Sequence, residues 1–158
     1  MNSRIVSTVG TCNAIMIPMP TSVTVKVYFE AAHRLHNPAQ SDSWNRKIYG
    51  KCNNPHGHGH NYVLEVTVLG PVDPTIGYLI DMKILKDILR ERIIDEVDHR
   101  FLNIEVPWLE GVIPSAENLA EAFFDRVADR LPDHLALLKV TVHETDRNSA
   151  TYWADDLA

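Results

Sequence analysis

Apolar and polar residues alternate strictly in several short stretches of the sequence. Residues 21–30 place valine or phenylalanine at every second position, with Thr, Lys, Tyr and Glu between them. Residues 61–69 show the same period, and residues 138–145 and 150–154 are two further β-rich runs. A period of two is typical of strands with one buried face, so the pattern predicts four strands, the first of which reaches His33.

Two longer stretches follow a period near 3.6 residues and predict helices. The first begins after Asp81, whose carboxylate suits an N-cap, and runs to about Val97. The second begins after Ser115, and its apolar stripe continues to Leu131, where Pro132 ends it. Both helices lie between the two pairs of strands.

The order strand, strand, helix, helix, strand, strand (ββααββ) predicts an α+β domain with an antiparallel sheet and both helices on one face. The other face is then solvated, packed on another subunit or part of a barrel. Residues 37–55 are polar and predict a long loop with a function. Residues 1–20 show no period and end in Pro-Met-Pro, so we expect a flexible extension before a domain at 21–158.

Composition narrows the class of protein. The chain has 158 residues, which suits one domain with a hydrophobic core, and its net charge of −6 argues against nucleic acid as the main partner. No apolar run approaches the roughly 20 residues that a membrane span needs. Two cysteines, Cys12 and Cys52, do not make a disulfide framework, so we expect a cytoplasmic protein.

The eight histidines are the one unusual feature of the composition. His58 and His60 are two residues apart at the start of a strand, so both side chains point to one face and can bind one Zn²⁺. His33 is the best-placed third ligand if the first two strands form a hairpin. Three histidines leave a fourth position open for water or substrate, as in catalytic zinc sites. The alternatives are surface histidines in a turn and a core histidine at His33.

Three further groups suit acid–base chemistry or binding. Lys51 and a nearby metal would lower the pKa of the Cys52 thiol and make it a base or nucleophile. The alternative, that Cys52 is a buried and unreactive cysteine, is equally compatible with the sequence. The Asp98-His99 pair can transfer protons, or it can simply cap a helix end. Glu144 lies on the same strand face as apolar residues. Its carboxylate either accepts two parallel hydrogen bonds from a ligand with a planar, guanidine-like edge or is solvated at the end of the strand.

Five landmarks occur together in one order, and they resemble a known family. They are Phe29-Glu30-Ala31-Ala32-His33-Arg34-Leu35, the run from Gly50 to Tyr62, Asp98-His99, Ser115-Ala116-Glu117-Asn118 and His143-Glu144-Thr145-Asp146. From about Val23 to Tyr152 the chain resembles 6-pyruvoyl-tetrahydropterin synthase and its bacterial relative, 6-carboxy-tetrahydropterin synthase of queuosine biosynthesis. The resemblance implies a T-fold subunit whose sheets form a barrel in a homohexamer of two stacked trimers.

The resemblance also implies a role for each candidate residue. Zinc binds His33, His58 and His60, and His56 is not a ligand. Cys52 is the thiolate that abstracts a proton, and Asp98 and His99 assist it from a neighbouring subunit. The pterin ring is held by Glu144, with Glu117 and Ser115 as secondary contacts. An alternative for Glu117 is a purely structural role, in which its negative charge interacts with the helix dipole.

The implied substrate is 7,8-dihydroneopterin triphosphate, which loses triphosphate to give 6-pyruvoyl-tetrahydropterin. The alternative product is 6-carboxy-5,6,7,8-tetrahydropterin, whose formation also releases acetaldehyde. Arg34 and Lys51 are candidates for binding the triphosphate, and a solvated-surface role is equally open for both. A zinc-binding module without turnover is a remote alternative, whereas a zinc hydrolase of the HExxH type is excluded because the motif does not occur.

Overall fold

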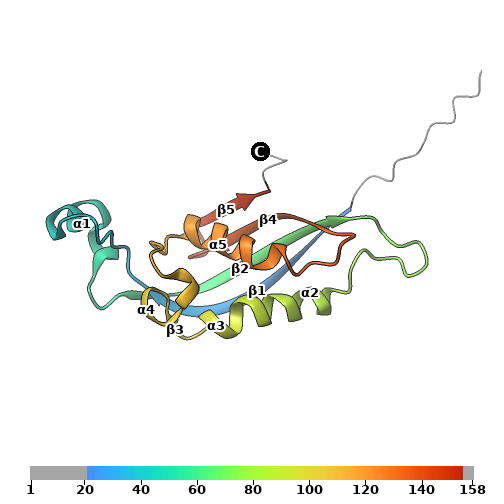
Figure 1. Cartoon of the computed structure of the whole chain (residues 1–158), viewed down its shortest axis with the longest axis horizontal. Coiled ribbons are helices and arrows are strands. Elements are labelled where there is room, and N and C mark those ends of the chain that lie inside the picture. The colour runs from blue at the N-terminus through green and yellow to red at the C-terminus, as the bar shows by residue number, and fades with distance from the viewer. Residues whose placement is uncertain (1–20, 155–158) are drawn as a thin grey trace, which may run out of the picture.

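The computed structural model describes residues 21–154 of the chain, which form a five-stranded sheet with helices on one face (Figure 1). The predicted extension at 1–20 lies outside the described residues. The sheet order is β3-β1-β2-β4-β5, with only β3 and β1 parallel. The bounds of the strands are β1 Thr21–His33, β2 His58–Gly70, β3 Arg100–Phe101, β4 Ala136–His143 and β5 Ser149–Trp153.

The two predicted helices begin where their capping residues indicate. The Asp81 carboxylate accepts a hydrogen bond from the backbone N–H of Lys83, and the Ser115 hydroxyl accepts one from the backbone N–H of Asn118. The helical segments are α1 Asp42–Tyr49, η1 Gly50–Asn53, α2 Met82–Leu89, the π-helical η2 Arg90–Ile94, α3 Asp95–Val97, α4 Leu102–Glu105, η3 Pro107–Leu109 and α5 Ala116–Ala128. None of them is long and apolar enough to span a bilayer.

The apolar face of the sheet carries the hydrophobic core. Phe29 of β1 stacks on Tyr62 of β2 with ring centroids 4.8 Å apart, and Phe123 of α5 meets Phe29 edge-on at 5.9 Å. Leu85 and Leu89 of α2 are fully buried in the same core cluster. The predicted alternation in the strands is therefore confirmed, and so is the position of both helices on one face.

The prediction of a long loop at 37–55 is wrong for part of this segment, which contains α1 and η1 (Figure 1). Ser41 caps α1 by accepting from the backbone N–H of Trp44. Asn45 is fully buried, and its amide donates to backbone carbonyls of the preceding turn, including those of Asn37 and Gln40. The helix is fastened by these polar contacts, which an apolar periodicity does not reveal.

Three element bounds also differ from the prediction. The second strand begins at His58 instead of residue 61, because its first residue pairs with His33 across the hairpin. α5 ends at Ala128, three residues before the predicted end, since the position before Pro132 disfavours helical backbone. β3 has only two residues and was not predicted, so α1 and β3 interrupt the simple ββααββ order.

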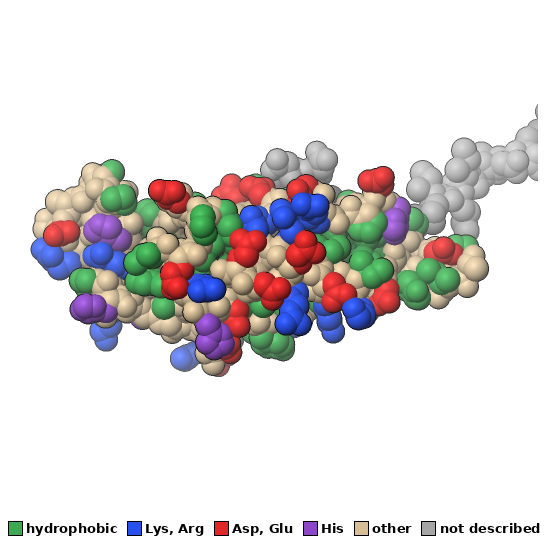
Figure 2. Space-filling view, turned by 60° about the horizontal axis from the view of Figure 1, so that its bottom comes forward, with side chains coloured by type: hydrophobic (Ala, Val, Ile, Leu, Met, Phe, Trp, Pro, Cys, Tyr) green, Lys and Arg blue, Asp and Glu red, His purple; other side chains and the backbone are tan. Residues whose placement is uncertain are grey.

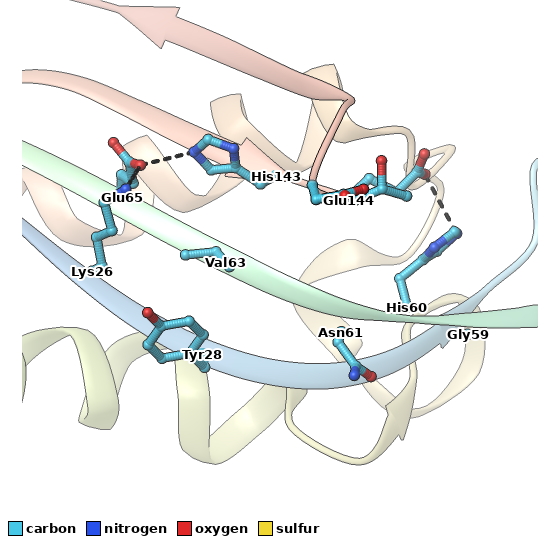
Figure 3. A pocket seen from close by; sticks show the side chains of 11 residues that line it. Lys26, Tyr28, Gly59, His60, Asn61, Val63, Glu65, His143 and Glu144 are labelled. Atoms are coloured by element: carbon cyan, nitrogen blue, oxygen red, sulfur yellow. Dashed lines mark hydrogen bonds and ion pairs between the residues drawn. The ribbon is translucent and has the colours of Figure 1, made fainter.

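The second face of the sheet is polar and carries charged side chains. Lys26 of β1 forms an ion pair with Glu65 of β2, and the same carboxylate lies 2.9 Å from His143 of β4 (Figure 3). Tyr28 is 68% exposed on this face. This surface therefore stays accessible in the single chain, while the helices cover the apolar face.

Candidate metal centre and active site

Three histidines converge where the β1–β2 hairpin ends. The hairpin register places His33 opposite His58, and His60 opposite Ala31, so all three side chains lie on the core face of the sheet. Their ligand nitrogens lie within 4.8 Å of one another, with the Nε2 atoms of His33 and His58 3.1 Å apart. The sequence predicted this convergence from the spacing and from the hairpin.

The orientation of His33 is set by a residue outside the hairpin. His33 is fully buried, and its Nδ1 lies 2.7 Å from the carbonyl oxygen of Pro114, just before α5. A neutral ring that donates from Nδ1 to this carbonyl keeps a lone pair on Nε2, which faces the other histidines. Burial lowers the pKa of His33 and of His58, which favours the neutral form that a metal ligand requires.

These side chains fit a metal ion. His60 Nε2 is buried and has no hydrogen-bond partner among the described residues, a costly state for a polar atom unless another group satisfies it. Two nitrogens bound at about 2.05 Å to tetrahedral zinc lie roughly 3.3 Å apart, close to the separation between His33 and His58. The three residues therefore form a candidate three-imidazole metal site.

Glu144 lies at the rim of this histidine cluster. Its Oε1 is 3.4 Å from His33 Nε2 and 3.7 Å from His60 Nε2, and its backbone N–H donates to the carbonyl of Asn148 in the turn before β5. Figure 3 shows Glu144 and His60 side by side at one end of a cavity of about 570 Å³. A carboxylate in this position can accept two parallel hydrogen bonds from a planar ligand.

Tyr62 of β2 has a polar end that the alternating pattern of residues 61–69 does not reveal. The Tyr62 side chain is 1% exposed, its hydroxyl has no hydrogen-bond partner in the described part of the chain, and its ring lies 5.5 Å from that of His60. Burial raises the pKa of Tyr62, and the charges of Glu144 and Cys52 raise it further. The signal in the sequence was a phenol two residues after His60, and therefore on the same face of the strand.

Cys52 is a free, half-buried thiol in η1, and it lines a second cavity together with His58. The Cys52 carbonyl accepts from the backbone N–H of Leu35, and the buried Asn53 amide donates to the Leu35 carbonyl at 2.7 Å. The Arg34 guanidinium donates to the Asn53 carbonyl at 3.0 Å. These bonds tie the segment after β1 to the segment before β2 and hold the thiol beside the histidine cluster.

Gly57 has a conformation and surroundings that require glycine. Its φ is +72°, and a Cβ atom there would lie 3.0 Å from the Phe101 ring and 3.1 Å from the carbonyl oxygen of His33. At Gly59 the backbone is ordinary strand, and a Cβ would meet only the Ala31 carbonyl at 3.5 Å. The steric requirement for glycine therefore applies to Gly57 and not to Gly59.

The Asp98-His99 pair lies at the edge of β1 that faces β3. His99 Nδ1 is 2.9 Å from Asp98, whose second oxygen accepts the backbone N–H of Glu30, and the His99 N–H donates to the Glu30 carbonyl. Asp98 raises the pKa of His99, and the Glu30 N–H lowers that of Asp98. Among the described residues, no hydrogen bond or ion pair joins this pair to Cys52 or to the histidine cluster.

The remaining candidates lie near the site but outside the cluster. Ser115 caps α5 directly after Pro114, whose carbonyl holds His33, so the start of this helix adjoins the metal centre. Glu117 is exposed in the first turn of α5, and His56 is exposed in the turn before β2. The structure brings none of these three side chains into the histidine cluster.

Comparison with known proteins gives one consistent family. The family model of 6-pyruvoyl tetrahydropterin synthase matches residues 22–155. A 6-pyruvoyl tetrahydrobiopterin synthase of Poecilia reticulata is 44% identical over 78% of this chain and 84% of its own. The solved structure of Caenorhabditis elegans 6-pyruvoyl tetrahydropterin synthase superimposes with a TM-score of 0.80 at 38% identity, over 86% of this chain and 96% of the other.

A bacterial relative is more distant. The 6-carboxy-5,6,7,8-tetrahydropterin synthase of Aquifex aeolicus is 32% identical over 78% of this chain and 92% of its own. The family model covers nearly all of the described residues, and the animal relatives have the higher identity. The chain that holds this histidine cluster therefore belongs to the 6-pyruvoyl tetrahydropterin synthase family.

Proposed function

We propose that the protein is a zinc-dependent synthase that converts 7,8-dihydroneopterin triphosphate into 6-pyruvoyl-tetrahydropterin and triphosphate. The observation that carries the proposal is the buried cluster of His33, His58 and His60, with Glu144 at its rim. Three imidazoles favour zinc with an open fourth position. The reaction needs no external oxidant or reductant, because the side chain of the substrate is oxidised while the dihydropterin ring is reduced.

Each residue then has a defined task. Bound zinc would supply a Lewis acid that acidifies the C–H and O–H bonds of the substrate side chain. Cys52, as thiolate, takes the proton, and Glu144 accepts two N–H bonds from the guanidine-like edge of the pterin. Ser115 and Glu117, at the start of the helix beside His33, are secondary contacts to the ring.

The Asp98-His99 pair assists from a neighbouring subunit in this proposal. Two observations support it: the His99 side chain is 76% exposed, and the pair makes no bond to Cys52 within the described part of its own chain. The polar, accessible face of the sheet suits the inside of a barrel built from several sheets. We therefore propose a cytoplasmic homohexamer of two stacked trimers.

The second candidate is the 6-carboxy product, which the Aquifex aeolicus relative favours. Both products need the same metal, thiol and pterin-binding carboxylate. They differ in whether a carbon–carbon bond of the side chain is also cleaved.

Incubating the zinc-loaded protein with 7,8-dihydroneopterin triphosphate separates the candidates. We expect one triphosphate per substrate and no acetaldehyde. Acetaldehyde in equal amount would assign the carboxy product instead. Release of neither compound would contradict both enzyme proposals and leave the zinc-binding module without turnover.

A further inference from the structure

Charge is distributed very unevenly along the chain. Residues 31–64 contain four Lys or Arg and a single acid, Asp42, whereas the rest of the chain contains eleven Lys or Arg and twenty Asp or Glu. In Figure 2, the α1 end of the molecule shows mainly blue and purple side chains and little red, whereas red and blue side chains are mixed over the helices beyond it. This acidic protein therefore has one cationic end, and that end carries Cys52 and the histidine cluster.

A cavity of about 570 Å³ opens at the cationic end, between α1, η1 and the start of β2. Arg46 and Lys51 line it together with Cys52 and His58, and no acidic side chain does. In the part of the chain that the structure describes, neither Arg46 nor Lys51 forms an ion pair. Arg34, the other candidate cation, is committed to Asn53 through hydrogen bonds of 3.0 and 3.4 Å.

The histidine cluster borders both this cavity and the one that Glu144 lines. His58 faces the cavity of Arg46 and Lys51, whereas His60 lines the other cavity with Glu144. A ligand whose ring lies at Glu144 and whose middle reaches the cluster would therefore place its far end between these two cations. Cys52 lines the same cavity as the two cations, so its thiol would lie beside the bond that joins the middle of the ligand to its far end.

We infer that Arg46 and Lys51 bind the polyphosphate group of the substrate. The inference rests on the proposed function and adds the subsite for the leaving group. Arginine offers a planar fork that pairs with phosphate oxygens in a bidentate way, and lysine adds a point charge. With no acid in the cavity, this charge is uncompensated and favours a strongly anionic ligand.

The test compares two pterins that differ only in their phosphates, neopterin and the oxidised, unreactive neopterin triphosphate. Their dissociation constants are measured by pterin fluorescence on the zinc-loaded protein, so the result does not depend on turnover. Wild type should bind the triphosphate more tightly. Arg46→Ala and Lys51→Ala should each weaken the triphosphate by about tenfold, and neopterin by less than about twofold.

Matched controls separate this role from general charge or folding effects. Lys47→Ala removes the same charge from the same helix, but Lys47 does not line the cavity, so both affinities should stay at the wild-type value. Arg46→Lys with Lys51→Arg should restore most of the preference. Unchanged triphosphate affinity in the Arg46→Ala, Lys51→Ala double variant, or equal weakening of both pterins, would overturn the inference. Absent turnover with an intact preference would contradict only the proposed reaction.

Discussion

The histidine cluster and the Asp98-His99 pair hold titratable groups in opposite environments. The cluster is enclosed by the hairpin and by the carbonyl of Pro114, and burial keeps the pKa of His33 low. The pair lies on an exposed edge, where a neighbouring carboxylate raises the pKa of His99. The three ligands of the first arrangement come from one chain, whereas the second presents an imidazole outward.

The backbone supports this contrast. His99 is the one residue other than glycine with a positive φ (+57°) in the described range 21–154, and its N–H is held by the carbonyl of Glu30. Such a conformation costs of order 1–3 kcal/mol and persists where surrounding contacts determine it. The strained backbone of His99 would have a function if its exposed imidazole completes the site of a neighbouring subunit.

The largest effect should come from breaking the buried cluster. His58→Ala removes one of three ligands, so we expect bound zinc to fall from about one per chain to a small fraction, and turnover to be lost. Metal content by atomic absorption, beside the rate of triphosphate release, measures both. His56→Ala is the matched control: His56 is exposed in the same short motif, and equal zinc loss there would refute the assignment of ligands.

Removing the thiol should separate metal binding from chemistry. Cys52→Ala leaves all three histidines in place, so zinc should be retained while the turnover number falls by roughly 10²–10⁴-fold. Single-turnover assays at saturating substrate measure the loss. Turnover at the wild-type rate would remove Cys52 from the mechanism.

A smaller effect is expected in the loop that supports the cluster. Gly57→Ala forces a Cβ against the Phe101 ring and the His33 carbonyl at a positive φ, so the free energy of unfolding should fall by about 1–3 kcal/mol. Gly59→Ala should change it by much less, because its Cβ makes only an ordinary contact. Urea denaturation of both variants decides this, and equal losses would contradict the role given to Gly57.

The smallest effect concerns the exposed pair. Asp98→Asn removes the carboxylate that raises the pKa of His99, so this pKa should fall towards its ordinary value of 6.5. In the wild type, the stabilisation from protonated His99 is present below pH 6.5 and is lost as the pH rises through its raised pKa. An NMR titration of the ring protons measures the shift. An unchanged pKa of His99 would contradict the assignment of this shift to Asp98 and attribute it to another group.

The sequence predicted those features that depend on local period. Alternation is a property of neighbouring residues, so β1 and the shared face of His58 and His60 could be predicted directly. His33 required one further assumption, the hairpin register, which the structure confirms. α1 was missed because its stability depends on the buried Asn45 amide and not on an apolar stripe.

The supporting residues of the site could not be predicted because their partners are distant in sequence. Pro114 meets His33 across 81 residues, and no periodicity connects the two. Asn53 stabilises the Cys52 segment through the Leu35 carbonyl, a contact that exists only once the hairpin has formed. Such contacts depend on the tertiary fold, which a pattern of single residues does not encode.

The most direct test of the central claim is complementation between two inactive variants. Cys52→Ala and His99→Ala are dissociated, mixed in equal amounts and reassembled. If the site combines the thiol of one subunit with the imidazole of its neighbour, random mixing restores up to about one quarter of wild-type activity. A mixture of Cys52→Ala with the Cys52→Ala, His99→Ala double variant should restore none. If the first mixture also stays inactive while the proteins assemble and bind zinc, the shared site is contradicted.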